Sequence, residues 1–119
     1  MRHKKSKGIL NRNYSHRKSM FYNMSKSIIF NKIIKTSLVK AKELRKYLEP
    51  LITLSKYNNL HNKRIVYSKL RSKKAVEILF NILGPKFKYN YGGYLRILKC
   101  GYRKGDSAKL AYIKFIYNF

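Results

Sequence analysis

Basic side chains crowd the first twelve positions of the chain, at Arg2, Lys4, Lys5, Lys7 and Arg12. Lysine offers a compact positive charge and arginine a planar fork of donors, and both groups suit the oxygen atoms of phosphate. No periodic apolar residues anchor this segment, so we expect residues 1–14 to form an arm without regular structure. The chemistry that these residues offer is the binding of a polyanion.

The excess of positive charge continues along the whole chain. The 119 residues hold 29 Lys and Arg against 4 Asp and Glu, a formal net charge of +25, and twelve of the basic residues precede the first acid, Glu43. A compact domain with this charge repels itself unless counter-charge comes from outside. Because 45% of the residues are apolar, a normal share for a globular domain, we expect a folded basic module that binds a polyanion.

The residue types give little support to a catalytic function. General acid–base catalysis needs positioned groups with tuned pKa values, and metal sites need clustered ligands. The histidines His3, His16 and His61 stand 13 and 45 residues apart, and the glutamates stand among lysines that can pair with them. A ribonuclease built on His16 and a distant partner is an open alternative, but we predict no catalytic residue, no metal and no cofactor.

Four helices should carry most of the charge, because apolar residues recur at helical spacing in four segments. The expected spans are residues 15–30, 37–57, 60–71 and 72–83. Ser15, Ser37 and Ser72 are the expected N-caps. Gly84 and Pro85 should end the fourth helix, with the glycine at the C′ position and the proline as a stop.

The last third of the chain has the period of β-structure. Residues 94–100 suit a strand, and residues 109–116 alternate between apolar and polar positions. Two strands alone are marginal, so residues 33–36 should supply a third. Cys100 stands among apolar residues in the first of these segments and is expected to be a buried, inert thiol.

Together these elements predict an α+β fold. About four helices should pack on a small three-stranded mixed sheet, in a single globular domain over residues 15–119 that follows the basic arm. Eleven tyrosines are present, and we interpret them first as core and surface filler, because composition does not identify a particular ring that stacks on a base.

The order of short motifs adds to this picture. The blocks are Met1-Arg2-His3, Leu10-Asn11-Arg12, Ser15-His16-Arg17, Ile34-Lys35-Thr36-Ser37, Lys40-Ala41-Lys42-Glu43-Leu44, Glu49-Pro50-Leu51-Ile52-Thr53-Leu54-Ser55-Lys56, Leu83-Gly84-Pro85, Gly92-Gly93-Tyr94, Arg96-Ile97-Leu98-Lys99-Cys100-Gly101, Gly105-Asp106 and Ala111-Tyr112-Ile113. In this order they resemble the bacterial large-subunit ribosomal protein L-seventeen family, over essentially the whole chain. Ser37 stands where that family usually has threonine, which preserves capping.

This resemblance implies a structural constituent of the large ribosomal subunit, bound to large-subunit ribosomal RNA of the 23S type and active in translation. It also implies protein neighbours near the nascent-chain exit, with no cofactor and no small-molecule substrate. We expect no membrane partner, since no apolar run approaches the ~18–20 residues that span a bilayer. A cytoplasmic ribosome is expected rather than an organellar one, because the basic character does not stop after the first helix as it would for a transit peptide.

Basic residues occur in every element, whereas a reader of a DNA groove usually concentrates its contacts on one helix. This spread favours folded RNA, whose phosphates approach from several sides. The expected RNA contacts are Arg2, His3, Lys4, Lys5, Lys7, Asn11, Arg12, His16, Arg17, Lys18, Lys35, Lys40, Arg45, Lys46, Arg96, Lys99, Arg103 and Lys104. The alternative is an architectural DNA-binding protein of the nucleoid.

Deletion of residues 1–12 should leave the helical content nearly unchanged but weaken RNA binding or incorporation into ribosomes, because the arm adds charge and no core. Circular dichroism measures the first effect, and co-sedimentation with large subunits measures the second. If the deletion unfolds the domain, the arm is part of the core and this division of roles is wrong.

Overall fold

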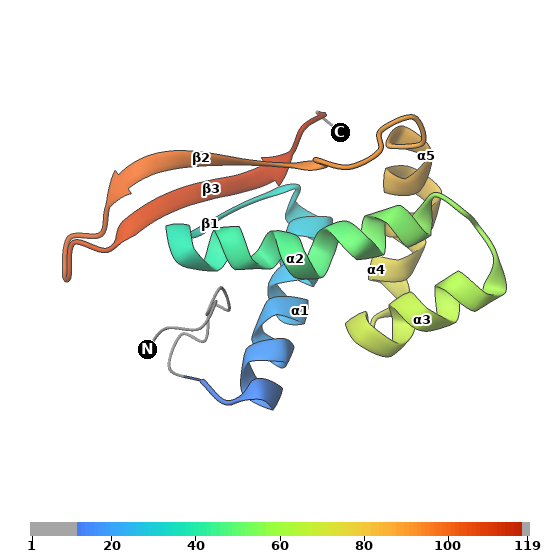
Figure 1. Ribbon diagram of the computed structural model, residues 1–119, viewed down its shortest axis with the longest axis horizontal. Helices are drawn as coiled ribbons and strands as arrows, with labels where there is room; N and C mark the ends of the chain where they lie inside the picture. Colours follow the sequence, from blue (N-terminus) through green and yellow to red (C-terminus); the bar gives the residue numbers. More distant parts are fainter. Residues whose placement is uncertain (1–11, 118–119) are drawn as a thin grey trace, which may run out of the picture.

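A long central helix separates a small sheet from most of the remaining helices in the computed structural model, which describes residues 12–117. The elements are α1 (Tyr14–Asn31), β1 (Ile33–Ser37), α2 (Leu38–Ser55), α3 (Leu60–Leu70), α4 (Lys73–Ile78), η1 (Leu79–Leu83), α5 (Gly84–Lys86), β2 (Leu95–Tyr102) and β3 (Lys109–Phe115). In Figure 1, α2 crosses the middle of the molecule with the sheet above it and α3 below it, and α1 starts below α2 and passes behind it toward β1. The fold is α+β, as predicted.

Helix α1 is capped by Asn13, so the expected cap at Ser15 is wrong. The Asn13 side-chain oxygen accepts a hydrogen bond of 2.8 Å from the backbone N–H of His16. Asparagine and serine are both good N-caps, and Asn13 has the extended backbone that a cap requires. The helix therefore begins at Tyr14, the last position that the sequence pattern assigned to the arm.

Helix α2 forms the centre of the core, and its buried face follows the predicted spacing. Ala41, Leu44 and Leu48 are fully buried, and Ser37 caps the helix by accepting the Lys40 amide at 3.4 Å. Pro50 lies inside the helix on its exposed side. The helix continues past it to Ser55, so the missing donor of the proline does not break the element.

Gly84 continues the fourth helical segment, so the expected C′ glycine is wrong. Its φ of −55° and ψ of −54° are right-handed helical values. Close packing explains the glycine: a Cβ here would lie 2.2 Å from the backbone oxygen of Ser55, at the end of α2. The π-helical segment η1 comes directly before Gly84 and Pro85, and Pro85 lacks the amide that would continue the regular ladder.

The sheet has the strand order β1-β3-β2 and is antiparallel throughout, where a mixed sheet was expected. Strand β3 lies in the middle, and Ile113 pairs with Ile34 on one side and Ile97 on the other. Ala111, Ile113 and Phe115 are buried, which confirms the alternation predicted for this segment.

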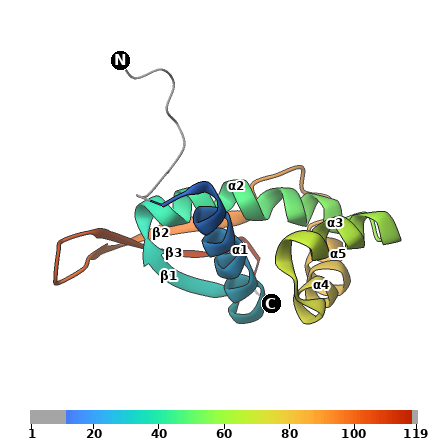
Figure 2. The same cartoon turned by 90° about the horizontal axis from the view of Figure 1, so that it is seen from below.

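The β2–β3 hairpin projects away from the helices (Figure 2). Its register shifts between Lys99 and Gly101, and Gly101 has a φ of 117°, which a side chain would disfavour. Cys100 lies in this irregular segment and is exposed, so the expected buried thiol is wrong. Leu95 is the only buried residue of β2, because the far half of the strand extends beyond the cover of the helices.

Aromatic rings join the two ends of the core. Phe21 of α1 stacks on Tyr47 of α2 at 4.8 Å between ring centroids. At the other end, Phe87 contacts Tyr94 at 5.1 Å and Phe115 at 6.0 Å, which ties the segment after α5 to the sheet. Such pairs contribute beyond their buried area, so several aromatic residues are core filler, as interpreted from the sequence.

Gly84→Ala should lower the free energy of unfolding by about 1–3 kcal/mol, because the new Cβ meets the backbone of Ser55 and the two helical segments must separate. Urea unfolding followed by circular dichroism measures this change. Gly105→Ala is the matched control, since a Cβ there would meet nothing within 4 Å. Equal stability of the two variants would show that this close approach does not limit packing.

Candidate nucleic-acid interface

The predicted RNA contacts that the structure describes do not converge on one site. Those at Arg2, His3, Lys4, Lys5, Lys7 and Asn11 lie outside the described residues. The others fall into three groups: Arg12, His16, Arg17 and Lys18 at the start of α1; Lys35, Lys40, Arg45 and Lys46 on β1 and α2; and Arg96, Lys99, Arg103 and Lys104 on the hairpin. Each group is held differently by its surroundings.

At the start of α1, two cations lie over one exposed ring. The guanidinium carbon of Arg17 and the ammonium of Lys18 each lie 5.8 Å from the centre of the Tyr14 ring. Arg17 also donates to the backbone oxygen of Arg12 at 3.4 Å. These contacts hold both positive groups near the first turn of the helix, next to the point where the arm joins it.

On α2, part of the positive charge is neutralised within the helix itself. Lys46 pairs with Glu43 at 2.9 Å, and Arg45 Nε lies 3.6 Å from a carboxylate oxygen of Glu49. Exposed pairs at this spacing contribute only a few tenths of a kcal/mol. Phosphate would have to compete with these carboxylates for Lys46 and Arg45.

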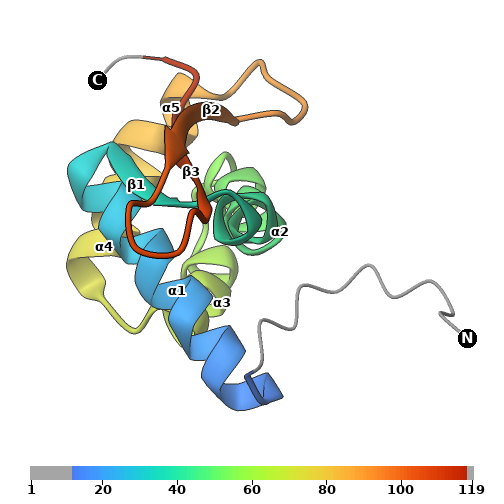
Figure 3. The same ribbon diagram turned by 90° about the vertical axis from the view of Figure 1, so that its left-hand side faces the viewer.

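Helices α1 and α3 lie side by side (Figure 3). A cleft between α1 and the end of α3 brings basic side chains close together. Its volume is about 420 Å³. The lining residues are Lys18, Ser19, Tyr22, Asn23 and Lys26 from α1, and Ser68, Lys69, Leu70 and Arg71 from the end of α3 and the residue after it. Four of these side chains are basic and none is acidic, so the cleft is suited to an anion.

Local structure positions two of the four cations of this cleft. Arg71 takes a left-handed backbone with φ of 56° at the C-cap of α3, and its Nε donates to the Ser68 oxygen at 3.1 Å. The ammonium of Lys69, on α3, lies 5.7 Å from the centre of the Tyr22 ring, on α1. The remaining donors of both groups stay available to phosphate oxygens.

Only part of this cleft was identified from the sequence. Lys18 was among the predicted contacts, and Lys18, Tyr22 and Lys26 stand at i, i+4 and i+8, a spacing that places them on one face of a helix. This helical spacing is a sequence signal that could have identified Lys26 as a further contact. Lys69 and Arg71 come from another helix more than forty residues later, and only the packing of α3 against α1 brings them to the same place.

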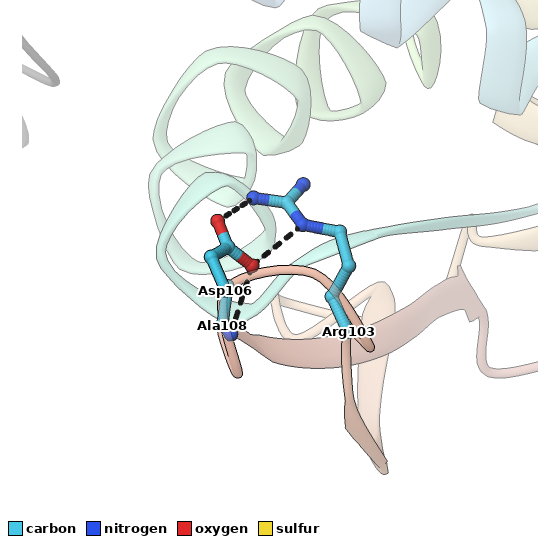
Figure 4. A network of polar contacts seen from close by, with 3 residues as sticks. All are labelled: Arg103, Asp106 and Ala108. Atoms are coloured by element: carbon cyan, nitrogen blue, oxygen red, sulfur yellow. Dashed lines mark hydrogen bonds and ion pairs between the residues drawn. The ribbon is translucent and has the colours of Figure 1, made fainter.

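The hairpin turn holds Arg103 in a local clamp with Asp106 (Figure 4). Arg103 donates from Nε at 2.9 Å and from Nη2 at 2.6 Å to the two carboxylate oxygens, and the Ala108 amide donates to the same carboxylate at 3.2 Å. The guanidinium fork expected to bind phosphate is thus directed at a carboxylate. Contact of Arg103 with RNA stays a prediction, and phosphate would have to compete with Asp106.

Two further findings concern other kinds of site. Among residues 12–117, no helix combines the length and the apolar character needed to cross a bilayer. In the same part of the chain, His, Cys, Asp and Glu side chains do not come together in groups of three that could hold a metal ion. The groups that do come together, at the α1–α3 cleft, are cationic.

The Arg103 clamp lowers the pKa of Asp106 from 3.8 to about 2, because first the Arg103 side chain and then the Ala108 amide donate to the ionised carboxylate. A depressed pKa means that the clamp stabilises the turn above about pH 4 and loses this effect as the pH falls toward 2. The carboxyl carbon chemical shift of Asp106, followed against pH, measures this titration.

Arg103→Gln should return the Asp106 pKa toward 3.8, whereas Lys104→Gln, a change of the same charge at the neighbouring exposed position, should leave it near 2. If both variants shift the titration equally, general charge rather than the clamp sets the pKa.

The comparison with known families agrees with the charge and the fold. The family model described as "Ribosomal protein L17" matches residues 20–116. The matched region runs from the second turn of α1 to the residue after β3, so it includes the residues that line the α1–α3 cleft from Tyr22 onward. Because the match covers well over half of the sequence, the chain belongs to the ribosomal protein L17 family.

Proposed function

We propose that this large-subunit ribosomal protein is a structural constituent that holds large-subunit ribosomal RNA by electrostatic contact on several faces. The observation that carries this proposal is the α1–α3 cleft, where four basic side chains line one concave surface without an acidic residue. Cations gathered in this way repel one another. A polyphosphate backbone in the cleft would relieve that repulsion and release the counterions bound to the RNA.

The positions of the three other basic groups support folded RNA over a DNA groove. The start of α1, the exposed side of α2 and the projecting hairpin lie on different parts of the molecule (Figures 1 and 2). A single groove cannot touch all of these surfaces, whereas helices and loops of a folded RNA can surround them. In this role the residues before α1 would extend the contact between RNA segments.

The proposed role is binding rather than catalysis. His16 and His61 are exposed on α1 and α3, where their ring N–H groups can donate to phosphate. A cytoplasmic ribosome and protein neighbours near the nascent-chain exit complete the proposal. The first point follows from the basic character that continues along the chain, and the second follows from the family resemblance of the sequence motifs.

The cleft variant Lys26→Glu with Lys69→Glu should weaken binding to large-subunit ribosomal RNA and lower co-sedimentation with large subunits, because it reverses two charges inside the cleft.

If the wild type neutralises roughly 6–10 phosphates, its affinity should fall on the order of 10³–10⁵ between 50 and 200 mM salt. The variant should reduce the slope of log affinity against log salt by about 2. Filter binding at several salt concentrations measures both quantities.

Lys42→Glu with Lys74→Glu is the matched control, since both lysines are exposed, lie outside the cleft and carry the same charge. It should retain most of the co-sedimentation. Failure of the wild type to sediment nearly one-to-one with large subunits would contradict the proposed function. Equal affinity for duplex DNA and an even distribution along chromosomes would support the nucleoid alternative instead.

A further inference from the structure

The loop between α5 and β2 leaves two aromatic side chains almost entirely exposed. Tyr89 is 85% exposed and Tyr91 is 102% exposed, although their neighbours Phe87 and Tyr94 are buried in the core. Large aromatic side chains stabilise a fold by burial, and these two are too exposed to contribute much in this way. We therefore infer that a partner outside the chain covers these two rings.

Asn90, between the two rings, anchors the loop to the body of the protein. The Lys56 ammonium and the Tyr94 hydroxyl both donate to its backbone oxygen, the latter at 3.4 Å, and the Tyr117 hydroxyl donates to its side-chain oxygen at 3.0 Å. Tyr94 is itself held by Thr53 at 3.0 Å. Contacts from the C-cap of α2, the segment after β3 and the loop itself thus fix Asn90, and the two flanking rings are exposed on either side of this fixed residue.

The surroundings of these rings are cationic. The Lys88 ammonium lies 5.6 Å from the centre of the Tyr89 ring, and the Lys56 ammonium lies 5.9 Å from that of Tyr91. Between Glu77 and Asp106 the sequence holds no acidic residue. An apolar protein surface placed on these rings would desolvate the lysines without pairing them, whereas a nucleotide offers a flat base to the ring and a phosphate to the lysine.

We propose that Tyr89 and Tyr91 form a stacking platform for unpaired bases of the ribosomal RNA, with Lys56 and Lys88 beside the adjoining phosphates. The inference rests on the proposed function and adds a second mode of contact to it. Bases inside a duplex have both faces covered by neighbouring bases, so the platform selects single-stranded or looped RNA. A preorganised ring loses little conformational freedom on binding, which makes the anchored loop an effective platform.

Intrinsic fluorescence offers a direct test, because the chain contains no tryptophan. Tyr91→Trp and Tyr89→Trp each create a single reporter in the full-length protein. Protein-free large-subunit ribosomal RNA and a single-stranded oligonucleotide should quench either reporter, since stacking brings the indole onto a base. A duplex RNA of the same length should quench it clearly less, even where the binding curves show comparable occupancy.

Affinity gives a second readout. The double variant Tyr89→Ala with Tyr91→Ala should bind ribosomal RNA more weakly by on the order of 10-fold for each ring removed. Tyr89→Phe with Tyr91→Phe keeps both ring faces and should restore binding. Tyr57→Ala with Tyr67→Ala removes two other exposed rings and should change the affinity by less than about 3-fold. Thermal unfolding should be the same for the wild type and the Tyr89 and Tyr91 variants, because their rings are not part of the core.

These experiments distinguish failure of the stacking platform from failure of the proposed function. Wild-type protein that fails to bind ribosomal RNA would contradict the proposed function. If the wild type binds and the alanine pair at Tyr89 and Tyr91 binds equally well, the platform alone is wrong. A blue shift of the Tyr91→Trp emission without quenching in assembled large subunits would assign the loop to a protein neighbour and would also overturn the platform.

Discussion

Repulsion among 29 basic residues is the constraint on which the rest of this structure depends. The ion pairs formed within residues 12–117 do little to oppose it, because each joins residues three or four positions apart in one helix or one turn. These pairs do not hold one element against another. Apolar packing and hydrogen bonds therefore join the elements, and the remaining positive charge is left for a partner that binds from outside. This division explains how an ordinary apolar core can coexist with a surface of nearly one sign.

The end of α2 links the core to the proposed contacts. The backbone oxygen of Ser55 lies so close to Gly84 that a Cβ at this position would not fit. This close approach packs the fourth helical segment against α2. At the same end of α2, the Thr53 hydroxyl is hydrogen-bonded to the Tyr94 hydroxyl, and the Lys56 ammonium donates to the backbone oxygen of Asn90. The loop that carries the exposed tyrosines is thus positioned by the helix whose other face fills the core, and a disturbance at Ser55 would reach both.

Sequence patterns predicted the elements of the fold well, because helix periods and strand alternation are local properties. The buried face of α2 and the strand at residues 109–115 are examples. Errors arose where a tertiary contact decided the outcome. Gly84 resembles a helix stop until its approach to Ser55 is known, and Cys100 resembles a core residue until the hairpin is seen to leave the helices. For the same reason Lys18 was identified as a contact while Lys69 and Arg71, which meet it across a cleft, were not.

The strand order has a consequence for the synthesis of the chain. Strand β1 pairs only with β3, and Ile34 meets Ile113, a partner 79 positions later. Closing so long a loop is entropically costly and slow, and it cannot occur before the last strand has been made. During synthesis from the N-terminus, the residues of α1 and α2 are made first, with an unpaired strand between them. The cationic protein thus completes its sheet last, and for most of its translation β1 is an open edge that other chains could join.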